Sequence, residues 1–171
     1  WLTGWLFGRK KNMKGYGPEG TEEFMNHFEQ AFDWDLRYRY LTNVHVEGSD
    51  LITTDIEPGV FYNQNGLKIT AFDVAHRPMD PDTEELLGLE GATFGYRVDY
   101  KGRSVIFSGD TRSLPGSKII EMRKGVDVLI HETQIPYPGD SKEAKLANVS
   151  MIVHSTPAQV AHVFSEAKPR L

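Results

Sequence analysis

Residues 94–111 read FGYRVDYKGRSVIFSGDT, and this stretch decides the fold. Two runs rich in β-branched and aromatic residues, 93–100 and 103–108, flank a Lys-Gly pair. Runs of this kind with a short glycine-containing turn between them predict a β-hairpin. The second run leads directly to Asp110, so a carboxylate is expected where that strand ends.

Outside this hairpin the chain alternates between strand and helix patterns. The pair Asn65-Gly66 is a strong hairpin signal between neighbouring strands. The remaining apolar patterns predict strands over residues 60–62, 67–75, 127–130 and 149–153, and helices from Thr21 onward and over 117–123 and 156–167. The last helix opens on Thr156-Pro157-Ala158-Gln159, which has the sequence of a capping box. We therefore expect a single α/β domain over residues 1–171.

Composition excludes several function classes. The chain has no cysteine, so it offers neither a disulfide framework nor a thiolate zinc site. A net charge of −5, from 19 basic and 24 acidic residues, gives no general basic footprint for nucleic acid. No apolar run approaches the ~20 residues that span a bilayer, so no membrane partner is expected. The chain opens on Trp1 without an initiator methionine, and we expect a fragment cut at both ends.

Histidines and carboxylates recur at the ends of the predicted strands. His76, Asp110, the pair His131-Glu132 and His154 each follow one of four predicted strands. In layered α/β sheets, ligands and catalysis gather where strands end and loops begin. Imidazole nitrogens and carboxylate oxygens without cysteine predict a site for zinc, manganese or iron.

Each of these residues also has a structural interpretation. A histidine at a strand end is more often a hydrogen-bonding loop residue than a metal ligand, and Asp110 could stabilise a turn. Four such positions in succession are harder to explain in this way than one. The other three histidines, His27, His45 and His162, lack comparable partners and are interpreted as structural or surface residues.

The motifs in order resemble those of a known family. They are the Phe-Asp-Val-Ala-His stretch of residues 72–76, the hairpin ending in Gly-Asp-Thr, the Asp-Val-Leu-Ile-His-Glu stretch of 127–132, and the His-Ser-Thr-Pro stretch of 154–157. Together they resemble the metallo-β-lactamase-fold hydrolases, in the branch that contains ribonuclease Z and arylsulfatase-like enzymes. The resemblance implies a four-layer αββα sandwich, here truncated at both ends.

The resemblance also implies a metal centre and roles for particular residues. It implies two divalent metal ions, zinc or alternatively manganese, with His76 as a terminal ligand and Asp110 as the bridging carboxylate. Glu132 and His154 resemble the pair that orients groups around the nucleophile and delivers a proton to the leaving oxygen. His131 is expected to point away from the metals.

Two family elements have no counterpart in this sequence. The first metal motif, His-x-His-x-Asp-His, would stand just before Trp1, and the last histidine ligand would follow a segment like residues 168–171. With only His76 and Asp110 of the usual ligands, the chain alone is expected to bind metal weakly and to be inactive.

The expected activity is hydrolysis of a small phosphodiester or sulfate ester by a hydroxide that bridges two metals. A tRNA 3′-processing endonuclease of the ribonuclease Z type is the alternative hypothesis. It ranks second because the loop over residues 79–91 has five acidic residues and no basic one, and such a loop repels a phosphate backbone. The basic run containing Arg9, Lys10, Lys11 and Lys14 could contact RNA, although such runs are more often solvated loops.

A non-catalytic scaffold that has lost its metal motif is a third hypothesis. A homodimer is a further expectation, and the compartment is left open with the cytoplasm preferred.

Overall fold

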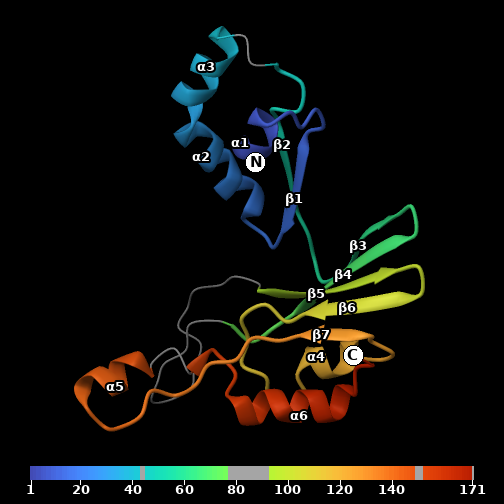
Figure 1. Ribbon diagram of the computed structural model, residues 1–171, viewed down its shortest axis with the longest axis vertical. Coiled ribbons are helices and arrows are strands. Elements are labelled where there is room, and N and C mark those ends of the chain that lie inside the picture. Colours follow the sequence, from blue (N-terminus) through green and yellow to red (C-terminus); the bar gives the residue numbers. More distant parts are fainter. Residues whose placement is uncertain (43–44, 77–92, 149–151, 171) are drawn as a thin grey trace. The chain divides into compact units, whose positions relative to one another are not determined.

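The computed structural model describes residues 1–42, 45–76, 93–148 and 152–170, and it divides into two compact units (Figure 1). The first unit comprises Trp1–Ile56 and the second Glu57–Leu171. None of the helices in the described ranges has the length and apolar character needed to cross a membrane.

The first unit combines three helices with a two-stranded parallel sheet. Its elements are α1 (Leu2–Leu6), β1 (Met13–Gly17), α2 (Thr21–Ala31), α3 (Asp33–Leu41) and β2 (Leu51–Asp55). Trp5 is fully buried, and its indole N–H donates to the carbonyl of His45 at 2.8 Å. The predicted helix from Thr21 is confirmed as α2.

One element of this unit, β1, has no clear signal in the sequence. β1 occupies a glycine-rich stretch that is typical of a turn, and it becomes a strand by pairing Met13 with Leu51, far along the chain.

Two residues of the basic run make contacts within this unit. The guanidinium of Arg9 donates to the carbonyl of Trp1 at 3.1 Å. Lys10 lies 4.0 Å from Glu47. These contacts agree with the interpretation of Arg9 and Lys10 as residues of an ordinary surface loop, whereas Lys14 lies in β1.

The second unit is built on a five-stranded sheet in the order β3-β4-β5-β6-β7. The strands are β3 (Gly59–Gln64), β4 (Leu67–Asp73), β5 (Phe94–Tyr100), β6 (Arg103–Phe107) and β7 (Val128–Ile130). The two predicted hairpins are confirmed, with Tyr100 paired to Arg103 at one of the turns. At that turn Lys101 and Gly102 have φ values of 48° and 75°, as a two-residue hairpin loop of type I′ requires.

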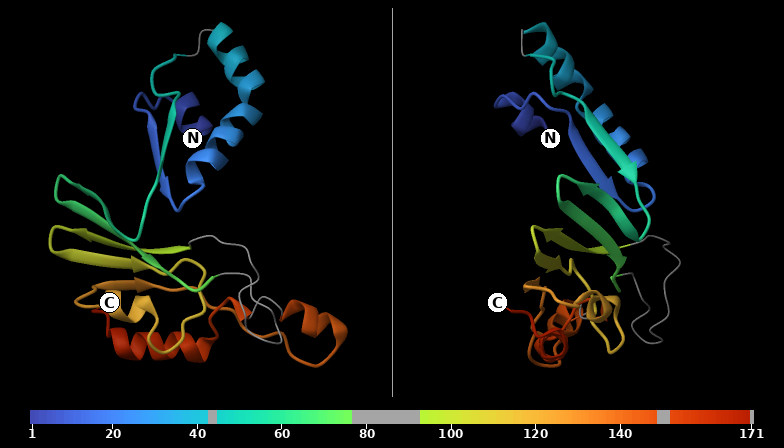
Figure 2. Two further views of the ribbon diagram at one scale, coloured as in Figure 1. Left: turned by 180° about the vertical axis from the view of Figure 1, so that it is seen from behind. Right: turned by 90° about the vertical axis from the view of Figure 1, so that its right-hand side faces the viewer.

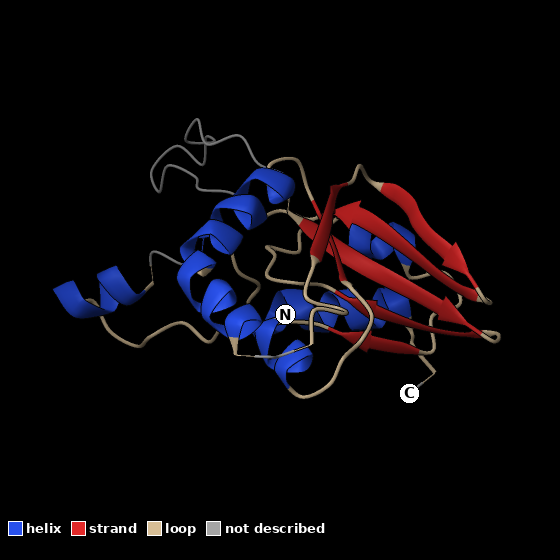
Figure 3. Cartoon of the chain, turned by 90° about the horizontal axis from the view of Figure 1, so that it is seen from above, coloured by secondary structure: helices blue, strands red, loops and turns tan. Residues whose placement is uncertain are grey.

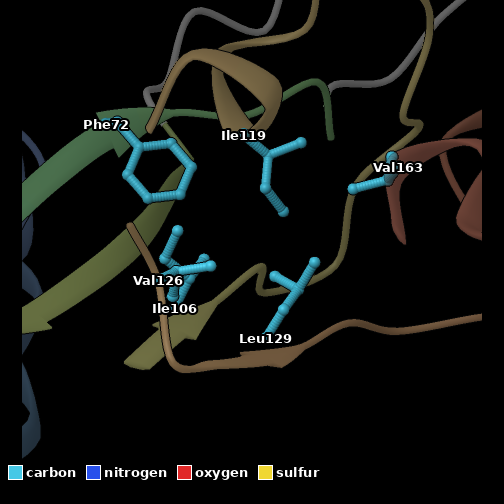
Figure 4. Packing of buried hydrophobic residues seen from close by; sticks show 6 residues of the cluster. All are labelled: Phe72, Ile106, Ile119, Val126, Leu129 and Val163. Atoms are coloured by element: carbon cyan, nitrogen blue, oxygen red, sulfur yellow. The ribbon is translucent and has the colours of Figure 1, made fainter. Parts of the chain in front are cut away.

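Helices α4 (Lys118–Met122) and α6 (Pro157–Ala167) cover one face of this sheet (Figure 2). Strand residues alternate between faces, so Ile106 and Leu129 point toward the helices. The buried cluster is drawn in Figure 4 and consists of Phe72, Ile106, Ile119, Val126, Leu129 and Val163. The opposite face carries exposed apolar side chains, with Phe107 at 42% and Ile130 at 50% exposure.

The predicted capping box is confirmed at the start of α6. The Thr156 hydroxyl accepts from the Gln159 backbone N–H, and the Gln159 side chain accepts from the Thr156 N–H. A strand over residues 149–153 is not confirmed: residues 149–151 lie outside the described part, and Ile152 and Val153 form a turn. The acidic loop over residues 79–91 also lies outside it. Figure 3 shows the helices and strands together, including the short α5 (Lys142–Ala147).

Candidate metal and catalytic site

Strand direction brings the predicted site residues to one edge of the five-stranded sheet. β4 and β6 are both antiparallel to β5, and β7 is parallel to β6, so these three strands run the same way. Their C-terminal ends therefore meet at one edge. His76 follows β4, Asp110 follows β6 and Glu132 follows β7, while His154 lies in the turn before α6.

Three of the predicted residues form a compact cluster. His76, Asp110 and His154 each offer one ligand atom, and these atoms all lie within 4.8 Å of one another. The ring centroids of His76 and His154 are 5.0 Å apart. The histidines are half-buried and the aspartate is exposed, so water has access to the cluster. Two imidazoles and a carboxylate form a donor set that suits a divalent metal such as zinc or manganese.

Glu132 lies directly behind His154. Its Oε1 atom accepts hydrogen bonds from the backbone N–H groups of Thr111 at 3.2 Å and Ser155 at 2.8 Å. The same oxygen lies 3.5 Å from Nδ1 of His154. Two backbone groups thus hold a carboxylate oxygen beside Nδ1 of His154.

His131 is engaged by other protein groups. Its Nε2 atom lies 2.8 Å from the hydroxyl of Ser113, and its Nδ1 atom lies 2.6 Å from the carbonyl of Glu132. It is not one of the three clustered residues, and both ring nitrogens have protein partners. These contacts fit the expected structural role of this histidine.

The remaining histidines lie elsewhere. His27 forms an exposed pair with Glu23 on α2 at 3.8 Å, and His45 packs edge-on against Trp5. His162 is exposed on α6. None of the three belongs to the cluster found among the described residues.

Sequence reasoning missed a buried serine that connects the loops of the site. Ser155 is fully buried, and its hydroxyl donates to the carbonyl of Thr111 at 2.5 Å and accepts from the N–H of Ser113 at 2.9 Å. The Thr111 hydroxyl in turn accepts from the N–H of Ala75, next to His76, at 3.2 Å. The loops that carry His76, Asp110 and His154 are thus tied together. The only signal for this role was the place of Ser155 directly after a predicted site residue.

A cavity of about 620 Å³ lies near the other end of these strands. Its lining includes Arg103, Ser104, Asp127 and Arg170, together with apolar strand side chains. Asp127 is buried, and the backbone N–H of Ser104, followed by Arg103 and Arg170, lowers the pKa of its carboxyl below the usual value. This carboxylate ties β6 to the start of β7 and is not part of the clustered site.

Comparisons with known proteins indicate the family of this chain. The family model of the β-lactamase superfamily domain matches residues 8–171. A ribonuclease Z of Mycobacterium avium is 28% identical over 116 residues, which cover 67% of this chain and 37% of that protein. A ribonuclease Z of Mycobacterium tuberculosis is 28% identical over 128 residues, covering 70% of this chain and 42% of that protein. The chain thus spans less than half the length of these two relatives.

Solved structures of similar fold include a metallo-β-lactamase-fold protein and a tRNase Z. The metallo-β-lactamase fold protein YhfI of Bacillus subtilis superposes with a TM-score of 0.58 at 12% identity, covering 98% of this chain and 53% of that one. The short form of human tRNase Z gives a TM-score of 0.54 at 20% identity, with 94% and 58% covered. These likenesses confirm the predicted fold class. The chain belongs to the β-lactamase superfamily.

Proposed function

We propose that this chain supplies part of the active site of a metal-dependent phosphodiester hydrolase. The observation that carries the proposal is the cluster of His76, Asp110 and His154, with ligand atoms within 4.8 Å of one another and Glu132 behind His154. A scaffold without catalysis would have no physical need for two imidazoles and a carboxylate gathered at an accessible sheet edge.

In this proposal His76 and Asp110 hold a divalent metal, with zinc or manganese as the fitting ions. When bound, the metal supplies a Lewis acid that activates water and neutralises charge on the phosphoryl group. A site with two metals requires ligands beyond this cluster, as the family resemblance implies. The chain by itself is therefore expected to bind metal weakly, with about micromolar or poorer affinity.

His154 acts in this scheme as the proton donor to the leaving oxygen, from Nε2. Glu132 places its Oε1 atom 3.5 Å from Nδ1 of His154, on the side of the ring that faces away from the leaving group in this scheme. Because Glu132 is itself held by the backbone N–H groups of Thr111 and Ser155, it keeps the ring in one orientation. The alternative role for His154 is a third metal ligand, since its ligand atom lies in the same cluster.

An RNA phosphodiester is the substrate that the two mycobacterial relatives support, because both are named ribonuclease Z. A small phosphate or sulfate ester is the second candidate. It is favoured by the net charge of −5, because contacts to many phosphates need an excess of basic side chains.

Two measurements test the proposal. Zinc binding by the chain is measured by competition with a chromogenic chelator for the wild type, His76→Ala and Asp110→Ala. Each variant is expected to lose about tenfold or more in affinity. His162→Ala, which removes an exposed histidine outside the cluster, is the matched control and should bind as the wild type. Equal zinc binding by all four proteins would refute the metal site.

Hydrolysis is measured on the product of the complete gene with zinc or manganese. The substrates are bis(p-nitrophenyl) phosphate, p-nitrophenyl sulfate and a precursor tRNA with a 3′ trailer. Cleavage of the precursor at its 3′ side, weakening steeply with salt, identifies the ribonuclease Z activity. Cleavage of only the small esters identifies the second candidate. Hydrolysis that persists unchanged in Asp110→Ala would refute the proposed site.

A further inference from the structure

His131 joins two segments of the candidate site through its imidazole ring. Its Nδ1 atom lies 2.6 Å from the backbone carbonyl of Glu132, and its Nε2 atom lies 2.8 Å from the hydroxyl of Ser113. Glu132 follows β7, whereas Ser113 belongs to the loop after β6 that also carries Asp110. The ring therefore bridges the two loops that supply the carboxylates of the site.

The two partners determine how the imidazole is used. A carbonyl oxygen can only accept a hydrogen bond, so Nδ1 of His131 is the donor to Glu132. In the neutral ring Nε2 is then an acceptor, and the Ser113 hydroxyl donates to it. Ser113 is 2% exposed, so this bond is shielded from water. Because both nitrogens are engaged by protein groups, the contribution of His131 is to hold its neighbours in place.

The bond from His131 completes the fixation of the Glu132 backbone. The N–H of Glu132 donates at 3.1 Å to the hydroxyl of Ser108, which is also 2% exposed. The Glu132 carbonyl is held by His131, so the peptide groups on both sides of its Cα atom are fixed. The direction in which the side chain leaves the backbone is then fixed as well. At the end of this side chain, Oε1 lies 3.5 Å from Nδ1 of His154.

Ser113 connects this bond to the rest of the site. Its backbone N–H donates to the buried hydroxyl of Ser155 at 2.9 Å, and the backbone N–H of Ser155 donates to the Glu132 carboxylate at 2.8 Å. The four residues His131, Ser113, Ser155 and Glu132 thus form a closed ring of hydrogen bonds. Each member is held from two sides, so the bonds support one another. Loss of the imidazole opens the ring at two bonds.

We propose that His131 is a positioning residue for hydrolysis, which sets the place of the Glu132 carboxylate beside His154 through the Glu132 carbonyl. The inference rests on the proposed function, because it assigns to these contacts a consequence for turnover. It also ranks the two bonds. The bond to Glu132 acts directly on the residue beside His154, whereas the bond to Ser113 acts on that residue only through Ser155.

Three substitutions in the complete protein loaded with zinc separate the two bonds. His131→Ala removes both, His131→Asn keeps an amide N–H near the position of Nδ1, and His131→Gln keeps an amide near the position of Nε2. We expect kcat for bis(p-nitrophenyl) phosphate to fall about 10–100-fold in His131→Ala, with KM within about twofold and zinc content unchanged. His131→Asn should recover most of this loss and His131→Gln little of it. His162→Ala, at an exposed histidine of α6, is the control, and circular dichroism verifies that all variants are folded.

Amide hydrogen exchange of the 171-residue chain gives a second readout that needs neither metal nor substrate. The N–H groups of Thr111 and Ser155 donate to the Glu132 carboxylate. Both should exchange about tenfold faster in His131→Ala, and at the wild-type rate in His131→Asn.

The two readouts separate the failure of this inference from the failure of the proposed function. Unchanged exchange or unchanged kcat in His131→Ala would overturn the role of His131 and leave the proposed function standing. An equal loss of kcat in His131→Asn and His131→Gln would also overturn it, because the bond to Glu132 would then have no special weight. A wild type that hydrolyses no phosphodiester would overturn the proposed function, and with it any role of His131 in turnover, whatever the exchange rates show.

Discussion

Replacing Ser155 by alanine tests whether the buried hydroxyl holds the site together. The change removes one hydroxyl and leaves two backbone groups without their partner, the N–H of Ser113 and the carbonyl of Thr111. Ser113 and Thr111 are each 2% exposed, so water cannot readily take the place of the hydroxyl. Each unsatisfied buried group costs about 1–3 kcal/mol. Since the carbonyl can relax more easily than the N–H, we expect a total loss of about 2–4 kcal/mol.

The assay is urea unfolding followed by circular dichroism, together with amide hydrogen exchange of the segments around Ser113 and Glu132. The variant should exchange faster in both segments, and its zinc affinity should fall about 10–100-fold because the ligands lose their fixed positions. Ser165→Ala is the matched control, since its hydroxyl donates only to a carbonyl on the exposed side of α6. A loss in Ser155→Ala below about 0.5 kcal/mol, with unchanged exchange, would refute the reasoning.

Three further predictions concern catalysis, acid stability and the core. In the complete protein loaded with metal, His154→Gln should lower kcat about 10²–10⁴-fold with little change in metal content. His162→Gln is the control and should have no effect. If His154→Gln loses bound metal in proportion to its loss of activity, His154 is a ligand instead. Asp127→Asn should make the free energy of unfolding less dependent on pH in the acid range. The Ser104 N–H lowers the folded-state pKa of Asp127. The contribution of this carboxylate to folding stability is therefore complete above about pH 4 and is lost as the pH falls through the folded-state pKa. An equally steep acid transition in that variant would contradict this role. Ile106→Ala, at a fully buried position, should cost about 2–5 kcal/mol in urea unfolding, and a cost under about 1 kcal/mol would contradict the assigned core.

The sequence was sufficient to predict the elements whose turns and caps depend on local side-chain chemistry. Both hairpins follow from glycine-containing pairs that accept positive φ, at residues 65–66 and 101–102. The start of α6 follows from Thr156 and Gln159, whose side chains satisfy two backbone N–H groups of the first turn. Motif order was sufficient to identify the family, because it depends on residue identities and not on their positions in space.

The features that join distant segments depended on tertiary structure. β1 is a strand only because β2 pairs with it, and its glycine-rich sequence carries no local signal for this. The sequence named His76, Asp110 and His154, but their convergence needed the common direction of β4 and β6, which β5 sets by pairing with both.

The role of Ser155 and the exposure of the α3 side chains also depended on tertiary structure. A hydroxyl between two loops has no periodic signature, because its partners come from other parts of the chain. The residues of α3 were readable as aromatic and charged, yet only the fold shows that Tyr40 faces Trp5 while Trp34 faces outward. Sequence determined the local elements and the chemistry available to this protein. Tertiary structure decided which of those groups meet, because long-range pairing depends on the whole chain packing at once.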